Sequence, residues 1–247
     1  MSKPAIYLDY NATTPLKPAA RAAMLAAMDV VGNPSSVHAF GRAARKVVED
    51  ARATIAHSIG VRPAQVIFTS GGTEATHLAL QGKPDMPVAV SAVEHVCGLA
   101  ARTDAHIIPV DKNGIVRLDA LRETLHRIGK PTLVSVMLAN NETGVLQPVR
   151  EIADIVHAAG GLLHCDATQA FGKIPVNMVL LSVDMMTLSA HKMGGPKGVG
   201  ALVLQDNIGI EPLMRGGGQE QTVAAAHPTW WALLASAQRR PRWPMTC

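Results

Sequence analysis

The sequence predicts an α/β protein built around a mostly parallel sheet of seven strands, with helices on both faces. Short, continuously apolar runs alternate with longer segments whose apolar residues recur at helical spacing. Strands that are apolar on both faces are typical of parallel sheets covered by helices. The chain has 247 residues, 48% of them hydrophobic and 17% charged, which is enough to bury a substantial core and excludes a disordered chain.

The individual elements follow from these patterns in chain order. Helical apolar spacing predicts helices over 19–28 (AARAAMLAAM), 41–59 (GRAARKVVEDARATIAHSI), 73–81 (TEATHLALQ), 118–128 (LDALRETLHRI) and 149–159 (VREIADIVHAA). Short apolar runs predict strands over 65–70 (QVIFTS), 87–92 (PVAVSA), 105–110 (AHIIPV), 132–138 (TLVSVML), 161–166 (GLLHCD), 184–189 (DMMTLS) and 199–204 (VGALVL).

Polar clusters follow five of the predicted strands. In open parallel sheets, ligands bind beyond the carboxyl ends of the strands, so these residues are the functional candidates. The clusters are Ser70–Thr73, Glu94–His95, Asn140–Glu142, Asp166–Gln169 and Ser189–Lys192. Each could be a turn or a helix cap on its own, and their joint placement favours a site.

The first cluster places Gly71, Gly72 and Thr73 between a strand and the start of a helix. Free amides and the helix dipole at such an N-terminus favour a phosphate, and glycines let it approach closely. The segment matches neither the Walker pattern nor GxGxxG, and a Gly-Gly turn before a helix is common in αβ proteins.

Asp166 ends a buried strand, where a carboxylate needs a cation or a hydrogen-bond donor. A protonated pyridine nitrogen would serve, and a helix-capping role is equally compatible with the segment. Lys192 lies in a turn of small residues, either as a solvated surface lysine or as a Schiff-base lysine beneath a cofactor. His95 and His191 directly follow strands and could stack on a ring, bind a phosphate, transfer protons or be structural.

Metal and disulfide chemistry have little support in the sequence. There is no HExxH, and His164, His191 and the cysteines form no standard ligand set, so we expect no metal site. Cys97, Cys165 and Cys247 are odd in number and lack CxxC spacing, so we expect reduced thiols.

Composition bears on location and partners. No apolar run approaches the roughly 18 residues that span a membrane, and the start of the chain lacks the apolar core of a signal peptide, so we expect a cytoplasmic protein without a membrane partner. The formal charge of +4 is mild, and only residues 238–243 (QRRPRW) cluster basic side chains. We therefore expect no nucleic-acid partner.

Together, a phosphate cradle, an aspartate for a ring nitrogen, a stacking histidine and a lysine describe a pyridoxal 5′-phosphate (PLP) site. The sequence also closely resembles the cysteine desulfurases of the NifS and IscS type, in the class V aminotransferase family, from Tyr7 to about Glu220. The motifs that carry the resemblance are YLDYNATTP (7–15), GNPSSVHAFGR (32–42), FTSGGTEATHLAL (68–80), EH (94–95), NNETGVLQP (140–148), CDATQAFGKIPV (165–176) and SAHKMGGPKGVGAL (189–202).

The resemblance implies a role for each matching residue. Lys192 would form the Schiff base and carry protons at the substrate α-carbon, and His95 would stack on the ring and help to move protons. Asp166 would pair with the pyridine nitrogen. The remaining matches are Gln169 for the ring hydroxyl, Asn141 for the ring oxygen and the substrate carboxylate, and Gly72, Thr73, Ser189 and His191 for the phosphate.

The resemblance also implies a fold and partners. We expect the large domain of PLP-dependent fold type I over residues 17–220, with residues 1–16 as part of the small domain and the rim of the active site. Most of the small domain would be missing. The family acts on L-cysteine, so the resemblance implies L-cysteine or a related amino acid as substrate, a homodimer, and an Fe–S scaffold or another sulfur acceptor.

The chain departs from the family pattern after Glu220. The family places its catalytic cysteine and its carboxylate-binding arginine further along, and neither Cys97 nor Cys165 falls at the matching position. Residues 221–247 hold all three tryptophans, in no clear period, although helical spacing is possible over 227–238. We therefore expect a divergent tail, with two explanations open: a truncated or frameshifted gene, or a natural hydrophobic tail that docks on the core or on a partner.

Two functions remain open. One is a PLP-dependent cysteine desulfurase, impaired because the segment with the catalytic cysteine is absent. The other is a non-catalytic protein with a PLP fold that pairs with a full-length relative or a scaffold. Release of alanine and sulfide from L-cysteine separates them.

Overall fold

The computed structural model describes residues 5–214 and Glu220. Residues 227–238, where helical spacing is possible, lie outside the described residues, as does the rest of the tail after Glu220. The helices are α1 (Pro18–Met28), α2 (Ala39–Ile59), α3 (Gly72–Gln81), α4 (Val96–Ala101), α5 (Leu118–Ile128), α6 (Val149–Ala158) and α7 (Met178–Leu181), with 3-10 turns η1 (Pro63–Gln65) and η2 (Ala190–Lys192). The strands are β1 (Val66–Thr69), β2 (Val88–Ser91), β3 (His106–Ile108), β4 (Leu133–Met137), β5 (Leu162–Asp166), β6 (Met185–Ser189) and β7 (Gly200–Leu204).

The strands form one seven-stranded sheet in the order β1-β7-β6-β5-β4-β2-β3. Strand β7 runs antiparallel to both of its neighbours, and the other pairs are parallel. The predicted mostly parallel sheet is therefore confirmed. In this order β4, β5 and β6 lie in the middle, so the strands that end at Met137, Asp166 and Ser189 deliver neighbouring residues to one edge.

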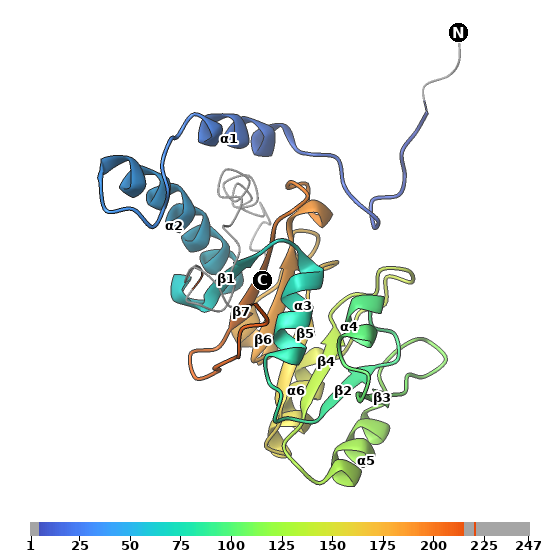
Figure 1. Cartoon of the computed structure of the whole chain (residues 1–247). Helices are drawn as coiled ribbons and strands as arrows, with labels where there is room; N and C mark the ends of the chain where they lie inside the picture. The colour runs from blue at the N-terminus through green and yellow to red at the C-terminus, as the bar shows by residue number, and fades with distance from the viewer. Residues whose placement is uncertain (1–4, 215–219, 221–247) are drawn as a thin grey trace.

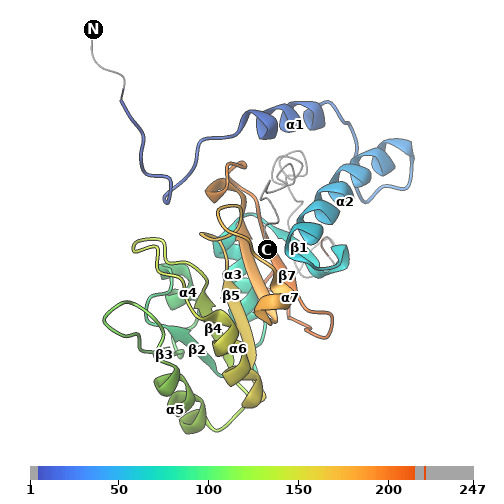
Figure 2. The ribbon, with the colours of Figure 1, turned by 180° about the vertical axis from the view of Figure 1, so that it is seen from behind.

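Helices cover both faces of the sheet, as predicted. Helices α3 and α4 lie on the face turned toward the viewer in Figure 1, and α6 and α7 lie on the opposite face in Figure 2. The helix α1 and the segment before it extend beyond the upper end of the sheet in both views. Each face has its own apolar cluster, because continuous apolar strands present side chains to both layers.

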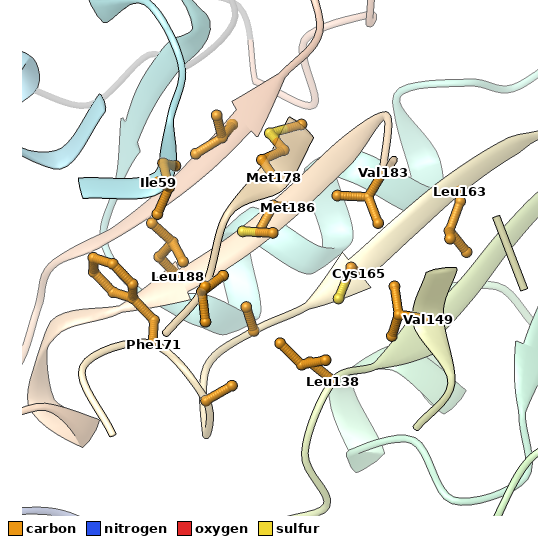
Figure 3. Packing of buried hydrophobic residues seen from close by; sticks show 14 of the residues in the cluster. Ile59, Leu138, Val149, Leu163, Cys165, Phe171, Met178, Val183, Met186 and Leu188 are labelled. Carbon is orange, nitrogen blue, oxygen red and sulfur yellow. The ribbon is translucent and has the colours of Figure 1, made fainter. Parts of the chain in front are cut away.

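The larger cluster lies between the sheet and α2, α5 and α6. Figure 3 shows Cys165 of β5 among Leu138, Val149 and Met186, where no part of the thiol side chain is exposed to solvent. This face is apolar throughout the central strands. Polar residues of the same strands must therefore point to the other face, because strand side chains alternate.

Local chemistry explains where the elements begin and end. Helix α1 begins at Pro18, whose ring suits the first turn. The His38 side chain accepts the Gly41 N–H at the start of α2, and Gly60 ends that helix in the left-handed conformation with φ +77°. At Gly200, an added Cβ would lie 2.4 Å from the Gly71 carbonyl carbon, so β7 can approach the β1–α3 turn only without a side chain there.

Candidate functional site

A cavity of about 240 Å³ lies at the carboxyl ends of the central strands. It is lined by every residue to which the sequence assigned a cofactor, substrate or catalytic role: Gly72, Thr73, His95, Asn141, Asp166, Gln169, Ser189, His191 and Lys192. The structure thus brings the five strand-end clusters together. A larger hollow of about 750 Å³ between α5 and α6 contains none of these residues.

Asp166 is the buried anion of the cavity. It ends β5, and Thr168 donates its backbone N–H to Asp166 Oδ1 at 2.8 Å. Burial raises the pKa of the Asp166 carboxyl, while the Thr168 hydrogen bond and the nearby Lys192 act in the opposite direction. A cation or a ring N–H donor placed here would favour the ionised carboxylate.

Lys192 ends the turn η2 directly after β6. Its Nζ donates to the Asn11 carbonyl oxygen at 2.6 Å. Burial lowers the pKa of Lys192, and Asp166, Asp9 and Glu142 partly oppose this effect. A larger fraction of neutral amine at neutral pH makes a lysine a better nucleophile and proton acceptor.

His95 caps the start of α4 through its side chain. Its Nδ1 accepts the Cys97 backbone N–H at 3.2 Å and lies 3.0 Å from Cys97 Sγ. An acceptor Nδ1 places the proton of the neutral ring on Nε2. Burial, with a contribution from Asp166, raises the pKa of the Cys97 thiol to about 11, so this thiol is protonated at neutral pH.

The opposite wall is formed by the start of α3 and by the turn after β6. An added Cβ at Gly72 would lie 3.2 Å from Thr168 Oγ1 and 3.4 Å from the Ser189 Cβ, so the wall is a close-fitting cradle. His191 Nδ1 lies 3.1 Å from Thr13 Oγ1, and burial together with Lys192 lowers the His191 pKa.

A second row of polar side chains, Ser135, His164 and Thr187, lies two residues before the ends of β4, β5 and β6. His164 on β5 is fully buried between Ser135 Oγ of β4 and Thr187 Oγ1 of β6, at 2.9 Å from each. Burial lowers the pKa of His164 to about 3, so the ring is neutral. The row lies two residues before Met137, Asp166 and Ser189, and it supports the cavity floor without adding charge.

Sequence reasoning did not assign roles to three residues that line the cavity or contact its lining: Thr168, which lines it, and Asn11 and Lys173, which contact Gln169. Asn11 accepts hydrogen bonds from Gln169 and Lys192 at its carbonyl oxygen. Thr168 lines the cavity beside Asp166. The position of Thr168, two residues after the strand-end Asp166, could have suggested a role for it at the site. Asn11 could not be found in this way, because it is 181 residues from Lys192 and no local pattern links the two.

Other ligand classes have no matching feature in the described part of the chain. Residues 5–214 and Glu220 contain no group of three or more His, Cys, Asp or Glu that could hold a metal ion. Within the same residues, no helix is both long and apolar enough to cross a membrane.

The cradle, the buried carboxylate and the half-buried lysine fit PLP. The Thr168 hydroxyl oxygen is buried and has no hydrogen-bond partner among the described residues, which suits a cavity built around a polar ligand. The cradle at the α3 N-terminus suits a phosphate, and Asp166 suits a ring nitrogen. The fold and the site thus define the large domain of a PLP-dependent fold type I protein.

The comparisons with known proteins identify the family. The model of the family "Aminotransferase class-V" matches residues 6–235, and the chain belongs to this family. An IscS-like cysteine desulfurase of Mycobacterium tuberculosis is 41% identical over 239 residues, which are 90% of this chain and 61% of the relative. The chain therefore spans less than two thirds of the length of this curated relative. Class V aminotransferases and cysteine desulfurases are PLP-dependent.

Solved structures agree with this assignment. The NifS-like protein of Rickettsia africae superimposes with a TM-score of 0.89 and 37% identity over 94% of this chain and 67% of that one. SspA in complex with cysteine gives a TM-score of 0.85 and 28% identity over 94% of this chain and 71% of that one. The similarity extends over the large domain of these folds.

Proposed function

We propose that the chain binds PLP in the cavity at the carboxyl ends of β4, β5 and β6 and acts on L-cysteine or a related amino acid, as a cysteine desulfurase-like protein. The observation that carries the proposal is the convergence of Lys192, Asp166 and the Gly72 cradle on one cavity. The similarity to SspA, which has been solved in complex with cysteine, supports the substrate class.

The roles of the residues follow from their places. When bound, PLP supplies an electron sink for the bonds at the substrate α-carbon. The Asp166 carboxylate would hold the ring nitrogen, Gln169 the ring hydroxyl, and His95 would stack on the ring. Lys192 Nζ would hold the cofactor and move a proton at the α-carbon.

Other residues of the cavity would bind the cofactor phosphate and the substrate carboxylate. Gly72 and Thr73 would offer backbone N–H groups of the α3 N-terminus to the phosphate, with Ser189 and His191 on the other side. A neutral His191 can still donate a ring N–H, which suits a phosphate oxygen. Asn141, at the edge of the cavity, would bind near the ring oxygen and the substrate carboxylate.

The thiols of the described chain bear on sulfur transfer. A persulfide forms on a thiolate, and the pKa of Cys97 is raised to about 11. Burial raises the pKa of Cys165 as well, and this thiol lies on the apolar face away from the cavity. Cys247 lies outside the described residues. We therefore propose slow sulfur transfer for the described thiols.

The raised thiol pKa values also favour the alternative, a non-catalytic PLP-binding protein that pairs with a full-length relative or a scaffold. A homodimer, an Fe–S scaffold or other sulfur acceptor, and a cytoplasmic location belong to the same proposal and rest on the resemblance. Both candidate functions require the cofactor, so cofactor binding is the first test.

The test is the absorbance spectrum of the protein after incubation with PLP, before and after borohydride treatment. We expect a yellow band that borohydride fixes covalently in the wild type and in Lys197→Ala, and not in Lys192→Ala. Lys197 is a matched control, because it is an exposed lysine five residues further on and does not line the cavity. A fixed band of equal strength in Lys192→Ala would refute the proposed role of Lys192.

Turnover then separates the two functions. Release of alanine and sulfide from L-cysteine in the presence of a reductant supports the desulfurase. Cofactor binding without release supports the non-catalytic protein. A Cys97→Ser variant that retains full release would show that Cys97 does not carry the sulfur.

A further inference from the structure

A second cavity, of about 400 Å³, lies beside the cofactor cavity and shares Lys192 with it. We call it the lysine vestibule. It is formed by Lys17, Lys173 and Lys192 together with Tyr10, Thr14 and Met193 and the prolines and small residues between them. Among the described residues, the charged side chains of its lining are these three lysines, while Asp9, Asp166 and Glu142 act on Lys192 from outside the lining.

Asn11 holds two of these lysines close together. Lys192 Nζ donates to the Asn11 carbonyl oxygen at 2.6 Å, and Lys173 Nζ donates to Asn11 Oδ1 at 3.1 Å. Two ammonium groups that contact one residue repel each other at short range. Burial, and next the charge of Lys192, lower the pKa of Lys173. An anion in the vestibule would relieve this repulsion.

Lys173 retains a donor for such an anion. An ammonium group has three N–H bonds, and in the structure Lys173 donates to Asn11 Oδ1 and Gln169 Oε1. Gln169 itself lines the cofactor cavity, so the contact ties the vestibule lysine to the cofactor site. The stem of Lys173 is half-buried, which limits the rotamer freedom that ligand binding would cost.

The position of the vestibule selects the kind of anion. The cofactor phosphate has its own cradle at the α3 N-terminus, in the other cavity. An amino acid brings an amino group, which must approach the cofactor at Lys192, and an α-carboxylate close to it. Asn11 Nδ2 donates to the Asn141 carbonyl oxygen at 2.9 Å, so Asn11 lies between Lys173 and the residue already expected near the substrate carboxylate.

We propose that Lys173 binds the α-carboxylate of the amino-acid substrate in the lysine vestibule. Asn11 holds the Lys173 ammonium group beside Lys192. The inference deepens the proposed function and rests on it. It assigns carboxylate recognition to the described part of the chain itself.

The first test compares L-alanine with L-alaninamide, which keeps the amino group and lacks the carboxylate. Dissociation constants are measured from the change in the cofactor absorbance of PLP-loaded wild type, Lys173→Met, Lys173→Arg and Lys112→Met. Lys112 is the control for charge, because it is exposed and does not line the vestibule. Loss of one charge-assisted hydrogen bond should weaken L-alanine binding about 10- to 100-fold in Lys173→Met.

The pattern across the variants decides the outcome. L-alaninamide should bind equally to Lys173→Met and to the wild type, Lys173→Arg should recover most of the L-alanine affinity, and Lys112→Met should match the wild type. An equal loss for both ligands, or no loss for L-alanine, would overturn the proposal. If circular dichroism shows that Lys173→Met is unfolded, Lys173→Gln takes its place, since its amide can still donate to Asn11.

The second test needs no cofactor, so it remains valid if PLP does not bind. Propionate is titrated into the cofactor-free protein by isothermal calorimetry. We expect binding to the wild type and to Lys112→Met, and binding weakened at least about tenfold in Lys173→Met. Propionate binding that is absent from the wild type, or unchanged in Lys173→Met, would refute the vestibule. Failure of PLP uptake with intact propionate binding would refute the proposed function alone.

Discussion

Glu94 gives the sharpest prediction, because it is a carboxyl buried beneath the cofactor cavity. Only 6% of the residue is exposed, and its Oε1 accepts the Met137 backbone N–H. Burial, with a second contribution from Asp166, raises the pKa of Glu94 from 4.5 to about 8. The side chain is therefore protonated in the folded protein and ionised in the unfolded chain at neutral pH.

The size of the effect follows from linkage. The folded state binds one more proton than the unfolded state between about pH 4.5 and pH 8, so the free energy of unfolding falls as the pH rises through this window. Each unit of pKa difference corresponds to about 1.4 kcal/mol, so Glu94 should cost on the order of 5 kcal/mol of stability above pH 8.

The perturbation is Glu94→Gln, which keeps the shape of the neutral acid and an oxygen for the Met137 N–H. The variant should match the wild type near pH 4.5 and become the more stable protein as the pH rises, by about 3 kcal/mol at neutral pH. Asp166 titrates in both proteins, so the difference between them reports chiefly on Glu94.

The assay is urea unfolding of the cofactor-free protein, followed by far-UV circular dichroism at several pH values across this window. Tryptophan fluorescence is unsuitable, because all three tryptophans belong to residues 221–247. A difference in unfolding free energy that stays constant within about 1 kcal/mol across the window would refute the reasoning, since it would mean that Glu94 is ionised in the folded state.

Three further changes test the frame and the floor of the site. Arg52→Ala should lower the unfolding free energy by about 3–5 kcal/mol in urea titrations, because Arg52 is buried and pairs with Glu220 at 2.8 Å; a loss below about 1 kcal/mol would contradict this. Gly200→Ala should cost about 1–3 kcal/mol and weaken PLP binding, because its Cβ would meet the Gly71 backbone; wild-type melting and affinity would rule out the clash. Asp166→Asn should leave the borohydride-fixed band and shift its pH titration, and an unchanged titration would remove Asp166 from the ring nitrogen.

Most of the sheet was predictable from the sequence. All seven predicted strands form within two residues of the expected bounds, because buried strands leave continuous apolar runs. Helices α4 and α7 were not predicted. They have only six and four residues, too few to show helical spacing, and α4 depends on the His95 side chain for its start.

The site was predictable only in part, for a physical reason. Strand-end residues can be found from sequence, because parallel strands bring their carboxyl ends to one edge. Asn11 reaches the site by a different route, and Lys173 contacts both Asn11 and Gln169. The segment before α1 contacts two lining residues of the cavity, Gln169 and Lys192, through the Asn11 carbonyl oxygen. It is held by Thr14, whose Oγ1 donates to the His191 carbonyl oxygen at 2.7 Å, and by Lys17, whose backbone N–H donates to the Gly194 carbonyl oxygen at 3.0 Å. Such tertiary contacts leave no periodic trace.

The two buried carboxyls beneath the cavity, Glu94 and Asp166, differ in their protonation. Glu94 and Asp166 repel each other when both are ionised, so at most one of them is charged at low cost. The Thr168 N–H and the nearby Lys192 favour an ionised Asp166, whereas in the described part of the chain Glu94 has Met137 and Ser135 as donors. A cationic ring nitrogen beside Asp166 would fix the single charge there and keep the proton on Glu94. Cofactor binding should therefore lower the pKa of Asp166 and keep Glu94 protonated, with the proton that leaves Asp166 available to the ring nitrogen.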